Sequence, residues 1–371
     1  MAGKRRAVVA HYFWGRGGAE IAAMWIIRSL IEAGYEIHIL TAGGFSLEEL
    51  EQAASVKLAR DSLVVHAFEK LNLPLSGALN HGLFLRWVRG HASDYDLRIT
   101  PSGVIDWGAP AIHFISSVIW NRTLRSQFLP SSVKLKSQQR VTAWVSGRST
   151  YDGSSDLYIA NSVWTMKVSQ PFCPGPMKVI APPVLVPESE LLSERSTDFL
   201  YVGRIEQEKK VDQSIEMIRA VRARGFDIRL HLIGELGADA YGEKIRDLAD
   251  RYREFVVVHG RLLGAEKWQV ISQCQFGINA CEIEAFGMSS AELAKSGPIV
   301  FVPGKGAQSE IVPLKELVWN SFDDAVDKIS RVLAEPSSWP GLSEQLKQHN
   351  RHLSCENFVS SVRETILEFE A

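Results

Sequence analysis

Short apolar runs alternate with helical segments along almost the whole chain, and this alternation constrains the fold most strongly. Residues 6–11 form an apolar run, residues 19–33 carry apolar side chains at helical spacing and stop at Gly34, and residues 36–41 form the next apolar run. A strand, a helix and a strand in that order predict a right-handed parallel unit. The sequence therefore predicts an α/β fold.

The alternation occurs in two series. Further strands of the first are predicted at 62–68, 97–100, 111–115 and 157–159, and strands of the second at 199–203, 228–233, 255–259, 276–279 and 299–302. Helices are predicted at 211–224, 238–253, 267–274 and 287–296. Because Pro182-Pro183 and a polar stretch separate the series, we expect domains at 1–185 and 198–355 and a linker at 186–197. An amphipathic C-terminal helix at 356–371 is expected to pack back on the first domain. We expect the two doubly wound sheets to face a cleft.

Composition excludes several classes of protein. The 371 residues are 46% hydrophobic and 23% charged, which is ordinary for a globular chain with two cores. The longest apolar stretch, 103–120, contains Asp106 and His113, so we do not expect it to span a membrane. The four cysteines form neither a C-x-x-C pair nor a zinc-ligand spacing and are expected to be reduced thiols in a cytosolic protein.

Charge is distributed unevenly along the chain. Residues 1–185 carry 19 Lys and Arg against 13 Asp and Glu, whereas the remainder carries 22 against 30, which opposes nucleic-acid binding. Residues 107–151 contain no acid, and basic and apolar side chains interleave there: Arg122, Arg125, Lys134, Lys136, Arg140 and Arg148 with Trp120, Phe128, Leu129 and Trp144. This pattern predicts contact with an anionic membrane surface or a lipid-diphosphate acceptor; the alternative is a solvated positive face.

Polar residues follow the first strand of the second series, where an open parallel sheet binds its ligands. Gly203 lets the chain turn off the strand, Arg204 offers a planar fork for phosphate oxygens, and Lys209 offers a mobile charge. The two basic residues can converge on one diphosphate. The alternative is a solvated loop in which they pair with Glu206 and Glu208.

Two further strand ends add polar groups. Glu284 follows a strand, and the helix predicted to begin at Gly287 presents free N–H groups that suit an anion. Glu292, one to two turns into that helix, can accept hydrogen bonds from the two hydroxyls of a ribose. The alternative is that both acids are capping and surface residues. A glycine-containing loop, 304–310, follows the next strand.

These strings together resemble the retaining family 4 glycosyltransferases. The resemblance rests on Val-Gly-Arg with Lys209, Gly234 after a strand, His-Gly260, Glu-Ala-Phe-Gly with Glu292, and Gly-x-x-x-Glu310. In the first half, Gly17-Gly18-Ala-Glu20 is similar to the family's glycine loop near the donor phosphates. The strings Ala160-Asn161-Ser162-Val-Trp164-Thr165 and Ala181-Pro-Pro-Val184 are similar to family usage, notably in the branch of α-mannosyltransferases that extend lipid-linked oligosaccharides. The resemblance implies the GT-B fold, in which two Rossmann-like domains with parallel sheets face each other.

The resemblance also implies roles for individual residues. Arg204 and Lys209 would hold the diphosphate, Glu292 the ribose, and Glu284 with the backbone of 286–288 the sugar. The predicted site comprises catalytic Glu284, Arg204, Lys209 and His113 and substrate-binding Gly17, Gly18, Phe286, Gly287, Met288, Glu292, Gly234, Arg261 and Glu310. Two positions depart from the family pattern, because Lys210 and Ala307 stand where glycine is usual.

Two other features bear on the chemistry. His113 is expected to follow the strand Ala111-Ile112 and to face the transferred sugar; the alternative is a core histidine. Asp94-Tyr95-Asp96 spells the D-x-D of metal-dependent glycosyltransferases of another fold. Because it precedes a strand, it lies at the wrong end for the cleft, so we expect no metal and no cofactor beyond the donor substrate.

The expected function is transfer of a hexose, with retention and without a metal, from a UDP- or GDP-linked donor to a hydroxyl of a glycan or lipid-linked glycan. The expected location is the cytoplasm, peripherally at the inner face of the membrane. A nucleotide-sugar epimerase and a non-catalytic nucleotide-sugar-binding scaffold are the alternatives. A dehydrogenase is disfavoured, because Gly15-x-Gly17-Gly18 lacks the G-x-G-x-x-G spacing and Glu36 follows too soon.

Overall fold

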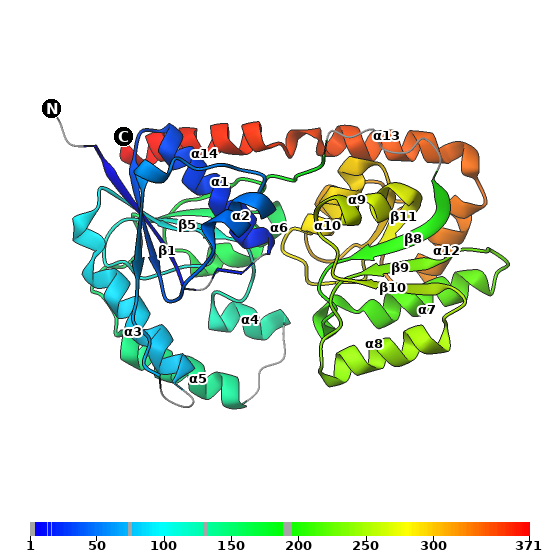
Figure 1. Ribbon diagram of the computed structural model, residues 1–371, viewed down its shortest axis with the longest axis horizontal. Coiled ribbons are helices and arrows are strands. Elements are labelled where there is room, and N and C mark those ends of the chain that lie inside the picture. Colours follow the sequence, from blue (N-terminus) through cyan, green and yellow to red (C-terminus); the bar gives the residue numbers. More distant parts are fainter. Residues whose placement is uncertain (1–3, 13, 16, 73–75, 129–132, 188–194) are drawn as a thin grey trace. The chain divides into compact units, whose positions relative to one another are not determined.

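The chain forms two compact α/β units, each built on a parallel sheet, in a computed structural model (Figure 1). The structure describes residues 4–371 except 13, 16, 73–75, 129–132 and 188–194. One unit comprises Met1–Pro183 and Leu353–Ala371, and the other Val184–His352. The predicted fold class, two parallel α/β sheets with a C-terminal helix, is confirmed. The linker predicted at 186–197 lies largely outside the described residues and stays a prediction.

The first unit contains a seven-stranded sheet of order β3-β2-β1-β4-β5-β6-β7, and every pairing is parallel. Its strands are β1 (Arg6–His11), β2 (Glu36–Thr41), β3 (Leu63–Ala67), β4 (Leu97–Thr100), β5 (Ile112–Ile115), β6 (Leu157–Ala160) and β7 (Met177–Val179). Its helices are α1 (Gly18–Glu32), α2 (Leu47–Ala53), α3 (Gly77–Gly90), α4 (Arg122–Phe128), α5 (Val133–Ser146), α6 (Val163–Ser169) and α14 (Cys355–Glu370).

Alternate residues of the central strands are buried on opposite faces of this sheet. Ala7 and Val9 of β1 pack in a core with α1, α2 and α14, whereas Val8 and Ala10 pack in a second core with α3. Strands buried on both faces read as continuous apolar runs, which is why they are visible in the sequence. The C-terminal helix α14 lies along α1, as Figure 1 shows.

The second unit contains a six-stranded parallel sheet of order β10-β9-β8-β11-β12-β13. Its strands are β8 (Ser196–Val202), β9 (Leu230–Ile233), β10 (Val256–Gly260), β11 (Cys274–Ile278), β12 (Ile299–Pro303) and β13 (Val318–Trp319). Its helices are α7 (Val211–Arg222), α8 (Ala240–Arg251), α9 (Gly264–Gln273), α10 (Met288–Ser296), α11 (Gln308–Ile311), α12 (Phe322–Leu333) and α13 (Trp339–His349).

The strand order of each sheet defines where a ligand can bind. The direction in which strands are added reverses between β1 and β4 in the first sheet and between β8 and β11 in the second. Open parallel sheets bind ligands at such a switch point, beyond the carboxyl ends of the strands. Within the described part of the chain, no helix is long and apolar enough to cross a membrane.

Candidate active site

The two loops at the switch point of the second sheet are joined by an ion pair. Lys209 follows β8 and Glu284 follows β11, and the Lys209 Nζ lies 2.5 Å from the Glu284 Oε2. Both side chains are about four-fifths buried, with relative exposures of 20% and 19%. The structure thus brings together the two residues expected to hold the diphosphate and the sugar, although 75 positions separate them in the chain.

The charge of Lys209 is maintained by this pairing. Burial of the amine would lower its pKa, but the charge of Glu284 and their hydrogen bond raise the pKa above its ordinary value. Lys209 therefore remains a cation at neutral pH and can exchange the Glu284 carboxylate for another anion, such as a phosphate.

A second chain of charges runs beside this pair. Lys210 Nζ lies 2.9 Å from Glu282 Oε1, and Lys305 Nζ lies 3.4 Å from the other carboxylate oxygen. The hydrogen bond from Lys210 is the main reason that the pKa of Glu282 falls below its usual value. Three loops, those after β8, β11 and β12, are joined in this way at one edge of the sheet.

The backbone at Lys210 is left-handed, with φ 50° and ψ 43°. It precedes α7, and its carbonyl accepts the first hydrogen bonds of that helix from Gln213 and Ser214. This conformation costs a side chain with a Cβ roughly 1–2 kcal/mol, which gives a physical reason for the glycine usual at this position in the family that the sequence resembles.

The loop that carries Glu284 is held in place by hydrogen bonds of Gln308, whose side chain is fully buried. Its Nε2 donates to the Cys281 carbonyl oxygen at 2.8 Å, and its Oε1 accepts from the Ser290 hydroxyl at 2.6 Å. Gly306, at φ 76°, contacts the same loop. A Cβ added at this position would lie 2.9 Å from backbone atoms of Glu282 and Glu284. The position of the Glu284 carboxylate therefore depends on these buried contacts.

Glu292 lies on α10 and is paired rather than isolated. Both of its carboxylate oxygens accept from the Lys267 Nζ of α9, at 2.9 and 3.0 Å. The Lys267 amine also lies 4.9 Å from the centre of the Trp268 ring. A ribose bound by Glu292 would have to share the carboxylate with this lysine or displace it.

The other predicted residues of the second unit occupy varied positions. Arg204 is exposed and pairs with Glu206 at 2.6 Å. Gly234 must be glycine, because a Cβ there would lie 2.1 Å from the Gly203 carbonyl oxygen. Arg261 is exposed and follows β10, whereas Phe286 is buried. Gly287 precedes α10, Met288 is the first residue of α10, and Glu310 lies on α11.

The glycine loop of the first unit is already occupied by an internal anion. Gly18 begins α1, and the Gly17 N–H donates to the Glu20 Oε2 at 3.0 Å. Glu20 thereby caps a free backbone N–H at the start of the helix. A carboxylate stands where the sequence predicted an approach to the donor phosphates.

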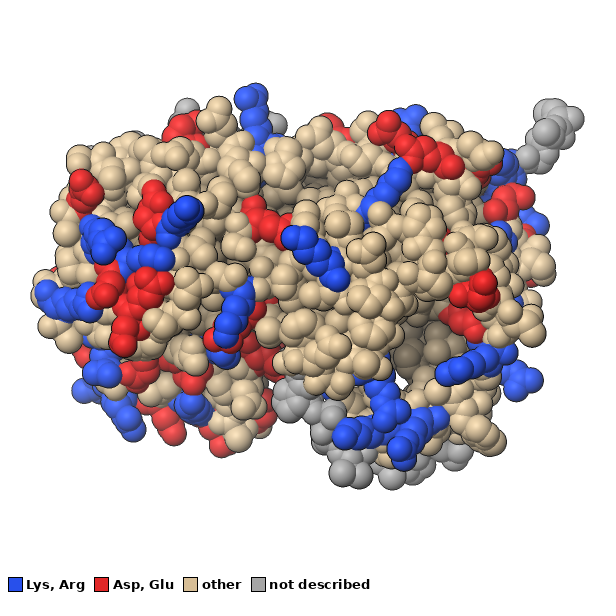
Figure 2. Space-filling model, turned by 180° about the vertical axis from the view of Figure 1, so that it is seen from behind, with Lys and Arg blue, Asp and Glu red and all other residues tan. Residues whose placement is uncertain are grey.

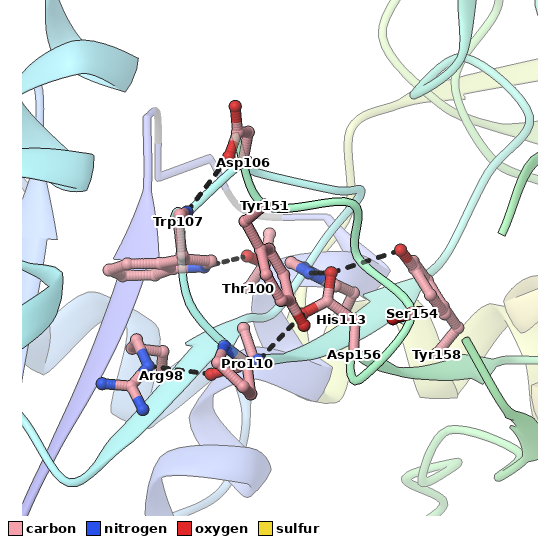
Figure 3. A network of polar contacts seen from close by, with 12 residues as sticks. Arg98, Thr100, Asp106, Trp107, Pro110, His113, Tyr151, Ser154, Asp156 and Tyr158 are labelled. Atoms are coloured by element: carbon pink, nitrogen blue, oxygen red, sulfur yellow. Dashed lines mark hydrogen bonds and ion pairs between the residues drawn. The ribbon is translucent and has the colours of Figure 1, made fainter. Parts of the chain in front are cut away.

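His113 is not where the sequence placed it. Strand β5 runs from Ile112 to Ile115, so His113 is its second residue, in register with Thr100 of β4. It is fully buried, and its Nε2 lies 3.3 Å from the Asp156 Oδ2 (Figure 3). The predicted position at the end of the strand was wrong, because the apolar run continues for two residues beyond it.

Asp156 organises a structural network around this histidine. Its Oδ1 accepts from the Ala111 N–H at 2.9 Å and from the Tyr151 hydroxyl at 3.1 Å, and its Oδ2 from the Tyr158 hydroxyl at 3.3 Å (Figure 3). Burial, the charge of Asp156 and its hydrogen bond raise the pKa of Tyr151 to about 12. These contacts agree with the alternative that His113 is a core histidine.

The D-x-D string also has structural contacts. Tyr95 is buried, and the Asp96 Oδ2 accepts from the Arg6 N–H at 2.8 Å, beside the start of β1. Both therefore lie at the amino end of the sheet.

A basic face lies on α5 and the segment after it. Lys136, Arg140, Trp144 and Arg148 recur at four-residue intervals and are exposed, with Trp144 at 84%. Figure 2 shows basic side chains gathered at the lower right, in the region of α5. Leu129 and the Lys134 side chain, included in the predicted pattern, lie outside the described residues.

Sequence reasoning missed several residues of the second-unit site. Lys267 and Glu282 belong to no string that was singled out for chemistry, although Lys267 pairs with Glu292 and Glu282 pairs with Lys210. Lys305 and Gln308 lie within the glycine-containing loop 304–310, so the position of that loop after a strand was the available signal.

Comparison with known proteins agrees with this geometry. Residues 196–335 match the family described as Glycosyl transferases group 1. The matched residues lie within the second unit, Val184–His352. No match was found among the curated proteins.

Solved structures similar to the whole chain share its fold. Sucrose-phosphate synthase from Thermosynechococcus elongatus is 16% identical, with a TM-score of 0.72 over 98% of this chain and 99% of that one. HepE of Anabaena, in complex with UDP, is 13% identical, with a TM-score of 0.70 over 98% and 100%. WaaG, a glycosyltransferase involved in lipopolysaccharide biosynthesis, is 14% identical, with a TM-score of 0.68 over 98% and 99%. The fold is GT-B.

Proposed function

We propose that the protein is a retaining glycosyltransferase that moves a sugar from a nucleoside-diphosphate sugar to a hydroxyl of a glycan or lipid-linked glycan. The observation that carries the proposal is the Lys209–Glu284 pair at the switch point of the second sheet. The match of residues 196–335 and the complex of HepE with UDP support a donor of this class.

The chemistry of the site fits departure of a diphosphate. As the bond between the anomeric carbon and the phosphate oxygen breaks, negative charge grows on that oxygen. Lys209 and the N-terminus of α10 provide fixed positive charge for it, and Arg204 provides a mobile guanidinium. Glu284, released from Lys209 by the phosphate, can then accept hydrogen bonds from hydroxyls of the sugar.

Retention belongs to the proposal. The acceptor oxygen attacks the anomeric carbon from the face that the diphosphate leaves, and the proton of the acceptor hydroxyl passes to the departing phosphate. Charge, hydrogen bonding and orientation supply the rate enhancement, and no metal ion takes part.

Nucleotide binding tests the donor site. In a thermal-shift series with UDP, GDP, UDP-glucose and GDP-mannose, at least one nucleotide should raise the melting temperature. At 100 times its Kd, it should add about 2.7 kcal/mol to the free energy of unfolding. Lys209→Ala should weaken that ligand about 10- to 100-fold, because a charged hydrogen bond is lost. Arg204→Ala and Glu284→Ala should abolish transfer without unfolding the protein.

Matched controls are available on α8, where Arg246 and Asp250 are exposed. Arg246→Ala and Asp250→Ala should leave binding and transfer unchanged. The proposal is defeated if none of the four nucleotides stabilises the protein, or if the Arg204 and Glu284 variants turn over like the wild type.

The basic face on α5 supports an anionic, membrane-bound acceptor. Trp144 is exposed beside Lys136 and Arg140, and Val141, on the same helix, is also exposed. An exposed indole among cations suits the headgroup region of a bilayer, and each basic residue near an anionic surface adds about 1 kcal/mol.

Vesicle co-sedimentation tests this surface. The protein should bind vesicles of phosphatidylcholine with phosphatidylglycerol at low salt, and not phosphatidylcholine alone. The double variant Lys136→Gln/Arg140→Gln should bind about 30-fold more weakly, since two cations are removed. Arg246→Gln, on α8, is the control and should bind as the wild type does. Equal binding by the double variant and the wild type would refute a role for α5.

A further inference from the structure

The switch point of the first sheet carries a histidine that the proposed donor site does not use. His11 ends β1, one of the two strands that flank this switch point. Its Nε2 lies 3.5 Å from the Glu20 Oε1, and both side chains are largely buried, with exposures of 14% and 15%. The ring of Trp14 meets the imidazole edge-on, with centroids 5.0 Å apart.

Glu20 fixes the chemistry of this histidine. Its other oxygen, Oε2, accepts from the Gly17 N–H, so the carboxylate is held by the backbone. Burial would raise its pKa, but the hydrogen bonds from His11 and the backbone lower it on balance, so the group is ionised at neutral pH. An ionised carboxylate can only accept, and the His11 Nε2 must therefore donate. In the neutral imidazole, Nδ1 then carries the lone pair.

One polar atom on each of these two rings lacks a protein partner. Within the described residues, the Nδ1 of His11 makes no hydrogen bond. The Trp14 indole is 8% exposed, and its buried Nε1 has no partner there either. Buried indole N–H groups normally have one.

This combination selects for a hydroxyl group. The two rings are in contact, and together they offer one acceptor and one donor, whereas a hydroxyl both donates and accepts. A phosphate offers acceptors only, and it would meet the Glu20 carboxylate, which already occupies the Gly17 N–H. The site therefore suits a neutral polyol better than the donor diphosphate.

We propose that His11 and Trp14 bind hydroxyl groups of a sugar residue of the acceptor. The Nδ1 of His11 accepts from one hydroxyl, the Nε1 of Trp14 donates to the same or an adjacent one, and Glu20 is a positioning residue that sets the imidazole tautomer. The inference rests on the proposed function and assigns the acceptor's binding contacts.

The tautomer of the His11 imidazole can be measured without an activity assay. In the full-length protein labelled with 15N-histidine, long-range proton–nitrogen NMR spectra should show His11 protonated at Nε2. Glu20→Gln keeps an oxygen for the Gly17 N–H but presents an amide donor to His11, so the proton should move to Nδ1. A wild-type imidazole protonated at Nδ1 overturns the inference.

Ligand binding supplies the second readout. With UDP present, at least one of methyl α-glucopyranoside, α-galactopyranoside and α-mannopyranoside should shift the His11 ring resonances of the wild type and not those of Glu20→Gln. In transfer to that glycoside, His11→Gln should raise the acceptor KM about tenfold, as the loss of one hydrogen bond predicts, and leave the Kd for UDP unchanged.

The control is His66→Gln, on β3, two strands away from the switch point. It should change neither KM nor the Kd for UDP. Normal nucleotide binding with no shift of His11 by any of the three glycosides, or with an unchanged KM in His11→Gln, overturns this inference alone. Failure of every nucleotide to bind the wild type overturns the proposed function instead.

Discussion

At the scale of single residues, Lys210 combines backbone strain with an ion pair at the candidate site. Of the described residues other than glycine, Lys210 and Ser55 have positive φ. Strain of this kind persists where surrounding contacts determine the conformation. For Lys210 these contacts are the pair with Glu282 and the start of α7, so the strained residue joins the loop that carries Lys209 to the loop that carries Glu284.

Substitution at this position should reverse the usual ranking of alanine and glycine. Lys210→Ala and Lys210→Gly both lose the pair with Glu282, but only glycine relieves the left-handed backbone. We expect the glycine variant to be more stable than the alanine variant by about 1 kcal/mol, despite the greater flexibility of glycine in the unfolded chain. Urea denaturation measures this. An alanine variant at least as stable as the glycine variant would show that position 210 is unstrained.

Individual site residues could be predicted from the sequence only where they follow the end of a predicted strand. The rule that ligands meet the carboxyl ends of strands led to Lys209 and Glu284, and the fold brings them into contact. The pair of Lys267 with Glu292 was not predictable, because it depends on how α9 lies beside α10. His113 was misplaced because it was assigned to the end of the short run Ala111-Ile112, although the apolar run predicted as a strand at 111–115 contains it and β5 ends at Ile115.

At the scale of elements, α14 and α5 show when an amphipathic pattern predicts a helix and when it does not. The pattern at 356–370 predicted a helix, and α14 spans Cys355–Glu370. Phe358, Val362 and Ile366 are buried in the core that also holds residues of α1. By contrast, no helix was predicted at 133–146, where α5 forms beside α3. Helix α5 has a mixed pattern, so tertiary packing rather than periodicity accounts for it.

Adjacent residues of α14 provide a direct test of its packing. Ile366 is 1% exposed, whereas Leu367 is 64% exposed. Ile366→Ala should destabilise the protein by about 2–4 kcal/mol through lost burial and a cavity. Leu367→Ala should change stability by no more than about 0.5 kcal/mol. Denaturant midpoints of the two variants measure the difference, and equal effects would mean that α14 is not anchored by its apolar side.

At the scale of the whole molecule, the net charge and the local ion pairs lead to different expectations about where an anion binds. The second half of the chain is acidic, yet the proposed diphosphate site lies there. Its acids are largely paired: Glu284 with Lys209, Glu282 with Lys210 and Lys305, and Glu292 with Lys267. An anion would therefore meet ion pairs that can rearrange rather than a field of unpaired carboxylates, and a count of charges along the sequence does not reveal this arrangement.

Hydrogen exchange of the full chain tests which loops receive the nucleotide. At 100 times its Kd, a nucleoside diphosphate that binds as proposed should slow amide exchange by up to about 100-fold. The slowing applies to amides that exchange only after the protein opens locally and the nucleotide dissociates. We expect the strongest protection in residues 203–210 and 279–291, which contain the switch-point loops and the start of α10. Lys209→Ala, measured at equal nucleotide concentration, should lose most of the protection, and Arg246→Ala none. Since both loops flank one switch point, protection that spares both of them would place the nucleotide elsewhere and contradict the donor site.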